Sequence, residues 1–217
     1  IDLLAWFQSL PPPAGGWTPP PYDMAVLLRE ARLATEWYLP AATGAPAPAD
    51  LAAEFDALAE AAFTPLLPAS TVPIYRDYHA ENLIWLPARR GRARVGLLDY
   101  QDMLIGHPAY DLVSLVGDAR RDVRVGPAMV ARYVAATGVD AEAFGAAAAV
   151  LGAPRNLKIL GIFTRLARRD GKPRYVGILP RVWASLGRDL AHPALAGLAE
   201  FVRAHVPAPD EAVRGRI

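Results

Sequence analysis

Three oxygen-bearing side chains fall within one segment of the sequence, residues 72–111, and their types suit phosphate chemistry. They are Asp77, Asn82 and Asp99. A hard divalent ion such as Mg²⁺ needs only one carboxylate and one amide from a protein when phosphates and waters supply its other ligands. A second carboxylate on a nearby loop can then accept the proton of a hydroxyl nucleophile. Together these groups are the parts of a phosphoryl-transfer site.

The elements that must position these side chains are short strands. Apolar runs that end at polar residues predict three of them, at Val72–Tyr75, Asn82–Leu86 and Val95–Leu98. The last two runs are separated by PARRGRAR, whose composition is typical of a hairpin connection. An antiparallel hairpin brings its outer ends together, so we expect Asn82 and Asp99 to converge, with Asp77 on the loop just before them.

Each of the three residues has a simpler explanation when it is taken alone. Asp and Asn are common turn residues because their short side chains bond to the nearby backbone. An Asp followed five positions later by an Asn also arises often by chance. The ordered set of strand, loop Asp, Asn, hairpin and second Asp is more specific than any one member. We therefore interpret the set as one site.

The segments DYHAENLIWL and LLDYQDMLIGHPAYDLVSL resemble the aminoglycoside phosphotransferase family, and the order of their polar residues resembles the catalytic loop of the protein-kinase-like fold. The resemblance implies that Asp77 is the catalytic base and that Asn82 and Asp99 hold Mg²⁺ on the phosphates of ATP. Two positions depart from the usual pattern. Tyr75 stands where the family usually has His, and Tyr100 follows the metal-binding Asp where protein kinases usually have Phe.

Four other polar residues in this region have more than one possible role. The resemblance implies that Asp111 bonds to the backbone of the catalytic loop and supports it, whereas its sequence position also suits an ordinary helix N-cap. We expect His107 to be structural, because phosphoryl transfer of this type needs no His. Glu81 could simply face solvent, and Asp102 could be a turn residue or a hydrogen-bond partner of the substrate.

The composition is that of a globular domain. With 217 residues, of which 53% are hydrophobic, the chain can bury a large core. Its 23 basic and 22 acidic residues give a net charge of +1, so we expect no nucleic-acid partner. Cys is absent, which fits a reducing cytoplasm, and we expect neither a signal peptide nor an apolar run long enough for a membrane. The chain starts at Ile1 rather than Met, so we expect a fragment or a processed form.

Helical patterns fill most of the remaining sequence. Apolar spacing and cap residues predict helices at residues 1–10, 23–39, 50–63, 111–119, 126–137, 140–153, 155–169, 174–190 and 193–205. Pro154 is expected to interrupt the long Ala-rich stretch, and we expect a frayed tail. The Pro-rich segment 11–21 is typical of a linker or of a loop that follows the surface. The predicted fold class is α+β and mostly helical, as in the C-terminal lobe of the protein-kinase-like fold with its small antiparallel hairpin set.

The sequence offers no candidate for the lobe that holds ATP in this fold. That lobe brings a five-stranded sheet, a Gly-rich loop and a strand Lys that contacts the phosphates. Lys158 and Lys172 are the only lysines, and both follow the proposed metal ligands in helical surroundings. We therefore interpret residues 1–217 as the C-terminal, catalytic and substrate-binding lobe, with the N-terminal ATP lobe missing in cis. Alone, such a chain should bind ATP weakly and turn over little or not at all.

A basic stripe on one predicted helix indicates the kind of hydroxyl compound that accepts the phosphoryl group. The segment RNLKILGIFTRLARR places Arg155, Lys158, Arg165 and Arg169 near one helical face. Such a stripe suits a neutral or anionic substrate better than a polycation, although a solvated helix face is the better explanation for any single one of these residues. The candidate substrate-binding residues are Asp102, Arg155, Asn156, Lys158 and Arg165.

A narrower resemblance covers approximately residues 22–190 and rests on DYQDMLIGHPAYDLVSLVGDARRDV and RNLKILGIFTRLARRDGKPRYVGILPRV. These segments are similar to the branch of the family that phosphorylates the anomeric hydroxyl of N-acetylmuramic acid and N-acetylglucosamine in cell-wall recycling. The resemblance implies a cytoplasmic, ATP- and Mg²⁺-dependent sugar kinase, whose basic stripe could pair with the lactyl carboxylate. Two alternatives stay open: an aminoglycoside- or choline-type small-molecule kinase, and a non-catalytic binding module without an ATP lobe.

Overall fold

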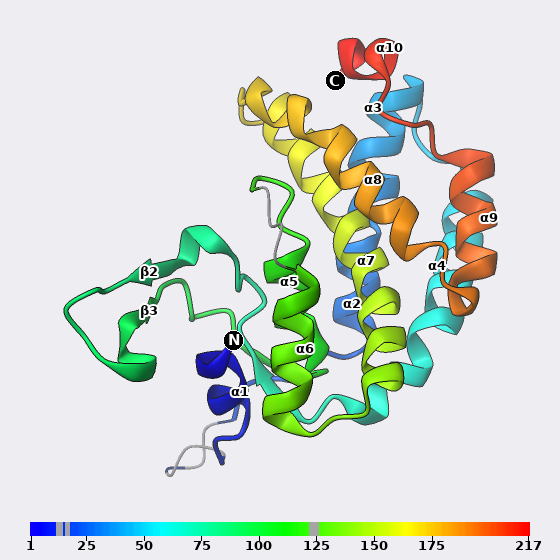
Figure 1. The fold of residues 1–217 in the computed structure, drawn as a ribbon. Coiled ribbons are helices and arrows are strands. Elements are labelled where there is room, and N and C mark those ends of the chain that lie inside the picture. The colour runs from blue at the N-terminus through cyan, green and yellow to red at the C-terminus, as the bar shows by residue number, and fades with distance from the viewer. Residues whose placement is uncertain (12–14, 16–17, 122–125) are drawn as a thin grey trace. The chain divides into compact units, whose positions relative to one another are not determined.

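The computed structural model describes residues 1–11, 15, 18–121 and 126–217, which form two compact units (Figure 1). The first unit comprises Ile1–Asp23 and Leu66–Ala148, and the second comprises Met24–Pro65 and Ala149–Ile217. The structure is mostly helical with two small antiparallel sheets. This agrees with the predicted fold class, which is α+β and mostly helical.

The first unit carries all the strands of the described chain, in two antiparallel pairs. They are β1 (Val72–Ile74), β2 (Leu83–Trp85), β3 (Val95–Leu97) and β4 (Leu104–Gly106). Strand β2 pairs with β3 in the register Leu83↔Leu97, which confirms the predicted hairpin. Figure 1 shows this hairpin projecting from the rest of the unit. Strand β1 pairs with β4.

The sequence analysis missed β4, because a three-residue run that ends in Gly is a weak strand signal. The end of the Pro-rich segment lies beside this strand. The Ile105 N–H donates to the Pro20 carbonyl at 2.8 Å, and the Ile105 carbonyl accepts from Tyr22 at 2.7 Å. This part of the predicted linker is therefore fixed to the sheet edge, whereas residues 12–14 and 16–17 lie outside the described chain.

Helices surround the strands of the first unit. They are α1 (Asp2–Gln8), the 3₁₀ turns η3 (Ala80–Asn82) and η4 (Gly91–Arg94), α5 (Ala109–Val116), α6 (Gly126–Thr137) and the first part of α7 (Ala141–Arg168). The buried side chain of Gln8 joins three of them, since it donates to the Pro108 carbonyl at 3.2 Å and accepts from the Tyr133 hydroxyl. Phe7 packs edge-on against Tyr75, with the ring centroids 5.1 Å apart. These contacts fix α1 against the segment that carries the candidate site.

The predicted start of α5 at Asp111 is wrong, because the helix begins two residues earlier. The Ala109 N–H donates to Nδ1 of the buried His107 at 3.1 Å, so an imidazole satisfies one of the N–H groups that every helix start leaves unpaired. The same His-Pro-Ala sequence recurs later, where the Ala194 N–H donates to His192 Nδ1 at 3.3 Å. His107 therefore has the structural role that was expected of it.

The second unit is entirely helical in the described chain. It contains α2 (Met24–Ala31), the π-helical turn η1 (Ala34–Tyr38), α3 (Leu39–Thr43), α4 (Ala49–Phe63), the rest of α7, η5 (Pro173–Ile178), α8 (Leu179–Asp189), η6 (Pro193–Leu195), α9 (Ala196–His205) and α10 (Glu211–Arg216). The turn η2 (Thr64–Ala69) continues the chain from this unit into the first unit. The chain continues helically past Pro40, which occupies the first turn of α3, where a missing N–H costs nothing.

The tail that was expected to fray is ordered. Asp210 caps α10 by accepting the Val213 N–H at 2.8 Å, and the Arg216 side chain donates to the Ala42 carbonyl at 2.9 Å. The buried Tyr38 hydroxyl donates to the Pro207 carbonyl at 2.6 Å. A cap and two long-range hydrogen bonds therefore hold a segment whose composition alone gave no helix signal.

Helix α7 runs through Pro154 without a break, so the predicted interruption there is wrong. A Pro inside a helix removes one hydrogen bond and costs about 3 kcal/mol, but residues 150–157 are all buried here, and their packing outweighs that cost. One 18-residue window of α7 has a mean hydropathy of 1.2, so by length and composition alone this helix could cross a membrane, contrary to expectation. Because 67% of the window is buried within the structure, α7 has the pattern of a core helix.

Gly161 lets α7 approach the π-helical turn η1. A Cβ atom added at Gly161 would clash with the Leu33 carbonyl, which belongs to the residue that precedes η1. That carbonyl is rigid backbone, so no side-chain rotation can relieve the clash. The close contact between these two segments therefore requires Gly at this position.

We expect Gly161→Ala to lower the free energy of unfolding by about 1–3 kcal/mol, because the extra methyl group must push two helical segments apart. Gly187→Ala is the matched control, since Gly187 lies in α8 of the same unit with nothing within 4 Å of the added Cβ. That variant should gain up to about 1 kcal/mol from helix propensity. Urea denaturation of the two variants measures both values, and equal effects would contradict the close contact.

Candidate active site

The loop after β1 is held by one buried carboxylate from α5. Asp111 is fully buried, and its Oδ2 and Oδ1 accept the N–H groups of Tyr75 at 2.7 Å and Arg76 at 3.0 Å. One turn later on α5, Ser114 Oγ donates to the Arg76 carbonyl at 3.1 Å. The two side chains lie on one face of the helix because they are three positions apart. They fix the backbone immediately before Asp77, and Asp111 does not cap its own helix.

The environment of Asp111 perturbs its titration. Burial raises the pKa of Asp111 to about 7, while the two backbone N–H donors act in the opposite direction. The nearby Asp77 carboxylate raises the pKa further. Tyr78, on the same loop, is also buried, and burial raises the pKa of its hydroxyl. The side chains that lie beneath the loop are therefore buried.

Two residues of the site adopt a backbone conformation that side chains rarely take. Arg76 has φ of 69° and Asp99 has φ of 63°, and they are the only non-glycine residues with positive φ in the described chain. Such conformations cost of order 1–3 kcal/mol each and persist only where the surroundings impose them. One of them directly precedes Asp77, and the other is itself a candidate metal ligand. Backbone strain of this kind is common at functional sites.

The Asn82 amide has a defined orientation. Its Nδ2 lies 3.0 Å from the Asp77 carbonyl oxygen and 3.4 Å from His79 Nε2. A backbone carbonyl can only accept, so Nδ2 must be the atom on that side. Both N–H groups of the amide therefore have acceptors within the loop. Its Oδ1 atom is left for a ligand.

The hairpin brings Asp99 to the same end as Asn82, as the sequence predicted. The Leu98 N–H donates to the Asn82 carbonyl at 3.0 Å, which extends the β2–β3 pairing by one step and places Asp99 directly after it. The Asp99 carboxylate is exposed, and its Oδ1 accepts from Gln101 Nε2 at 2.6 Å. Gln101 is a contact that the sequence analysis did not anticipate.

The donor atoms suit Mg²⁺ better than a transition metal. Among the described residues, no group of three or more His, Cys, Asp or Glu side chains could hold a metal. Asn82 Oδ1 and the Asp99 carboxylate offer two hard oxygen donors, one of which carries charge. Mg²⁺ commonly binds through one or two protein carboxylates or amides plus phosphates and waters. These two residues therefore fit the ion that was expected.

The carboxylate of Asp77 is free of hydrogen bonds to the described protein. The residue is half-buried on the loop. Its backbone carbonyl accepts from the His79 N–H at 3.0 Å and from Asn82 Nδ2, so the main chain is fixed while the carboxylate stays available. A general base needs this combination of a fixed backbone and free oxygens.

Arginines after α5 pair with the turn that carries Asn82, which the sequence analysis did not foresee. Glu81 lies 3.2 Å from Arg120 Nη1 and 3.5 Å from Arg121 Nη2, so it is half-exposed but paired. The run GDARRD at the end of an apolar helix was the available signal. Asp102 is exposed, and its backbone carbonyl accepts from Arg76 Nη1 at 3.4 Å.

The candidate substrate-binding residues on α7 belong to the second unit, and most have partners there. Lys158 Nζ lies 3.0 Å from Glu30 Oε1, and Asn156 Nδ2 donates to Asp189 Oδ2 at 2.7 Å. Burial raises the pKa of Asp189 to about 6. Arg155 and Asn156 are buried, so a solvated helix face does not describe them. Arg165 keeps a buried Nε without a hydrogen-bond partner among the described residues.

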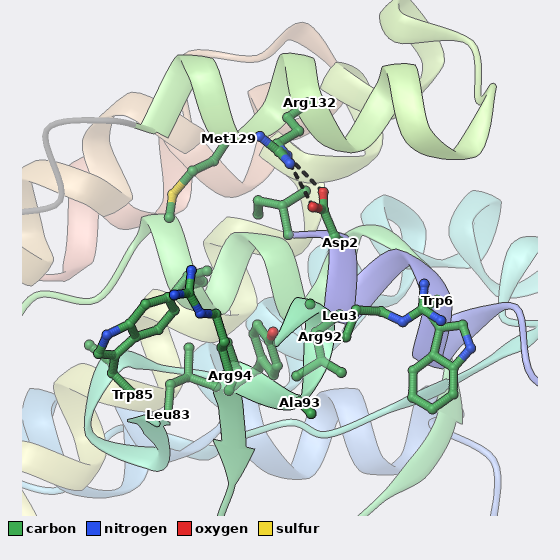
Figure 2. Close-up of a pocket in the computed structure, with 16 residues that line it drawn as sticks. Asp2, Leu3, Trp6, Leu83, Trp85, Arg92, Ala93, Arg94, Met129 and Arg132 are labelled. Atoms are coloured by element: carbon green, nitrogen blue, oxygen red, sulfur yellow. Dashed lines mark hydrogen bonds and ion pairs between the residues drawn. The ribbon is translucent and has the colours of Figure 1, made fainter. Parts of the chain in front are cut away.

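A groove of about 1540 Å³ lies in the first unit against the catalytic loop (Figure 2). Arg92 stacks over Trp6 at 4.8 Å, Arg94 stacks over Trp85 at 5.1 Å, and Asp2 pairs with Arg132 at 2.6 Å. Tyr78 and Ala80 also line the groove, whereas the three candidate residues of the site do not. The groove is therefore separate from the acceptor and metal groups.

Comparisons with known proteins agree on one family. The family model described as "Phosphotransferase enzyme family" matches residues 1–150. An N-acetylmuramate/N-acetylglucosamine kinase of Caulobacter vibrioides is 52% identical over 141 residues, which cover 64% of this chain and 39% of that protein. Proteins of the same description from Pseudomonas putida and Pseudomonas aeruginosa are 34% and 35% identical and cover 93% and 98% of this chain. The chain spans 60% and 63% of the length of those two proteins.

Replacing Asp111 tests the anchor of the loop. Asp111→Asn leaves one acceptor for two backbone N–H groups, so we expect a loss of about 1–3 kcal/mol in the free energy of unfolding. Because burial raises the pKa of Asp111 to about 7, above the value of 3.8 for an unburied Asp, the folded wild type binds a proton more tightly than the unfolded chain. Its contribution to stability therefore falls as the pH rises from about 4 to 7.

The variant lacks this titration, so the stability difference between wild type and variant should be largest near pH 4 and smaller at pH 7. Denaturant unfolding across that range measures it. A stability difference that grows with pH would show that the two N–H donors lower the pKa of Asp111 more than burial raises it.

Proposed function

Because the chain belongs to the phosphotransferase enzyme family, we propose that it is the catalytic lobe of a kinase that phosphorylates a hydroxyl group of an amino sugar. The observation that carries this proposal is the orientation of Asn82. Its amide nitrogen is engaged by the loop, its oxygen is left for a ligand, and the hairpin brings Asp99 to the same place. Two oxygen donors beside a loop carboxylate are what phosphoryl transfer from ATP requires.

Each side chain has one role in the proposed reaction. Asn82 and Asp99 would hold Mg²⁺, which would neutralise charge on the phosphates of ATP. Asp77 orients the sugar hydroxyl and accepts its proton. The bond from the sugar oxygen to the γ-phosphorus forms as the bond from that phosphorus to the β–γ bridging oxygen breaks, and ADP leaves. Asp111 keeps the loop in place but touches no reacting atom.

The proposed acceptor is the anomeric hydroxyl of N-acetylmuramic acid or N-acetylglucosamine, which serves the recycling of cell-wall sugars in the cytoplasm. Its support is that three relatives at 34–52% identity are described as kinases of these two sugars. Within the chain, Asp102, Arg155, Asn156, Lys158 and Arg165 remain the proposed substrate-binding residues. Asn156 Oδ1 and Arg165 Nε are both buried without a hydrogen-bond partner among the described residues, and of these two residues Arg165 is the one that carries a charge.

We also propose that ATP is bound by an N-terminal lobe that these 217 residues do not include. The chain has no Lys before residue 158, whereas a lobe of this kind needs a Lys on a strand. The relatives exceed the matched region by more than a third of their length, which is enough for such a lobe. The 217 residues alone should therefore turn over little substrate.

Asp77→Asn should abolish transfer in the protein that includes the ATP lobe. Loss of a general base lowers the turnover number by about 10²–10⁴-fold, while the melting temperature should hardly change because the carboxylate supports no other described group. Asp50→Asn, at the exposed start of α4, is the matched control and should keep full activity. Turnover of N-acetylmuramic acid with ATP is the measurement. Activity of the Asp77 variant close to wild type would refute its role as base.

The two sugars differ by a lactyl carboxylate, which separates the proposed role of Arg165 from a structural one. Arg165→Gln should raise KM for N-acetylmuramic acid by about 10-fold or more, as expected for one charge-assisted hydrogen bond, and leave KM for N-acetylglucosamine nearly unchanged. Arg169→Gln, at an exposed Arg169–Asp170 pair, is the control. Equal effects on both sugars would refute the pairing. Preference for an aminoglycoside or choline in the same assay would refute the substrate class.

A further inference from the structure

His79 and Asp118 each bury a polar atom without a hydrogen-bond partner among the described residues. The atoms are Nδ1 of His79 and Oδ2 of Asp118. Buried polar atoms are nearly always paired in folded proteins, and an orphan calls for an explanation. Neither residue belongs to the acceptor, metal or substrate groups proposed above. Both lie in the segments that surround Asn82.

The hydrogen atoms of His79 can be assigned from its neighbour. Asn82 Nδ2 can only donate, so His79 Nε2, which lies 3.4 Å away, must accept. A neutral imidazole that accepts at Nε2 carries its proton on Nδ1. The orphan atom of His79 is therefore a donor, whereas the orphan atom of Asp118 is an acceptor. The two atoms could therefore form a hydrogen bond with each other.

Asp118 is tied to the turn that contains His79 and Asn82. Its side chain is almost fully buried, and its Oδ1 accepts the backbone N–H of Arg120 at 3.2 Å and the Nε–H at 3.0 Å. The same arginine reaches Glu81 with Nη1 at 3.2 Å. Glu81 lies between His79 and Asn82 on the turn η3. Arg120 thus occupies one oxygen of Asp118 and holds the other oxygen beside this turn.

We propose that Asp118 and His79 are positioning residues for Asn82, in a relay that runs from carboxylate to imidazole to amide. Asp118 Oδ2 accepts the Nδ1–H of His79, directly or through one water, and His79 Nε2 accepts from Asn82 Nδ2. This inference rests on the proposed function, because it assumes that Asn82 Oδ1 binds the metal. It assigns two residues that the reaction itself does not use.

The relay matters because an amide can bind a metal through only one of its two ends. If the Asn82 amide turned over, its N–H groups would face the cation. The Asp77 carbonyl holds one N–H, and an imidazole fixed by a carboxylate holds the other. Outer groups of this kind orient metal ligands in many proteins, and their loss typically lowers metal affinity or activity about 10–100-fold.

The test is the affinity of the full polypeptide, ATP lobe included, for Mn²⁺ in the presence of ADP, measured by electron paramagnetic resonance. His79→Leu and Asp118→Asn should each weaken Mn²⁺ binding about 10-fold or more, and the double variant should lose little beyond either single one, because both changes break one relay. His79→Gln should recover part of the affinity, since its amide can accept from Asn82 and donate to Asp118.

His107→Leu is the matched control, because His107 is also a buried imidazole of the first unit but contacts the start of α5 instead. It should lower the melting temperature and leave the Mn²⁺ affinity unchanged. If His79→Leu fails to fold, the Mn²⁺ affinity of the nearly isosteric Asp118→Asn variant still tests the relay. If Asn82→Ala loses Mn²⁺ affinity but Asp118→Asn keeps it, the relay is refuted and the proposed function stands. Unchanged affinity in Asn82→Ala would overturn the proposed function and the relay with it.

Discussion

The buried carboxylate of Asp111 is the constraint on which the rest of the site depends. Removing a carboxyl group from water is costly unless hydrogen bonds replace its hydration, and here the replacements are the N–H groups of Tyr75 and Arg76. Those two bonds force the chain through the left-handed conformation at Arg76. The turn presents the Asp77 carbonyl to Asn82. One side chain on a helix therefore sets the geometry of the loop that carries Asp77 and Asn82.

The second unit is organised differently from the site. Close contact between helices, rather than hydrogen bonds to a loop, determines how its segments are arranged. Gly161 admits the backbone of Leu33, and the π-helical turn at Ala34–Tyr38 begins at that point. Polar side chains inside this unit are matched in pairs, such as Lys158 with Glu30 and Asn156 with Asp189. Buried pairs of this kind tolerate few substitutions, since removing one partner leaves the other buried and unpaired.

The sequence predicted the β2–β3 hairpin correctly, whereas it predicted other parts of the scaffold less well. The convergence of Asn82 and Asp99 follows from hairpin closure, which is a local property that apolar runs and a turn reveal. Strand β4 and the unbroken helix through Pro154 depend on tertiary contacts, which override local signals. The charged run GDARRD was only a weak signal for the pairing of Glu81 with Arg120, because this pairing joins segments whose proximity the fold defines. For the same reason a basic stripe on one helix did not reveal that Arg155 and Asn156 are buried.

The two arginine–tryptophan stacks beside the catalytic loop give the molecule a built-in optical reporter. Of the five tryptophans in the sequence, Trp6 and Trp85 are 40% and 61% exposed, so their indole emission responds to solvent and to quenchers. Trp85 lies at the end of β2, on the strand that starts directly after Asn82. Arg94 and Trp85 both belong to this hairpin and stack at 5.1 Å (Figure 2), so opening of the β2–β3 pairing would disturb the stack. Steady-state fluorescence can therefore follow the integrity of the hairpin without a label.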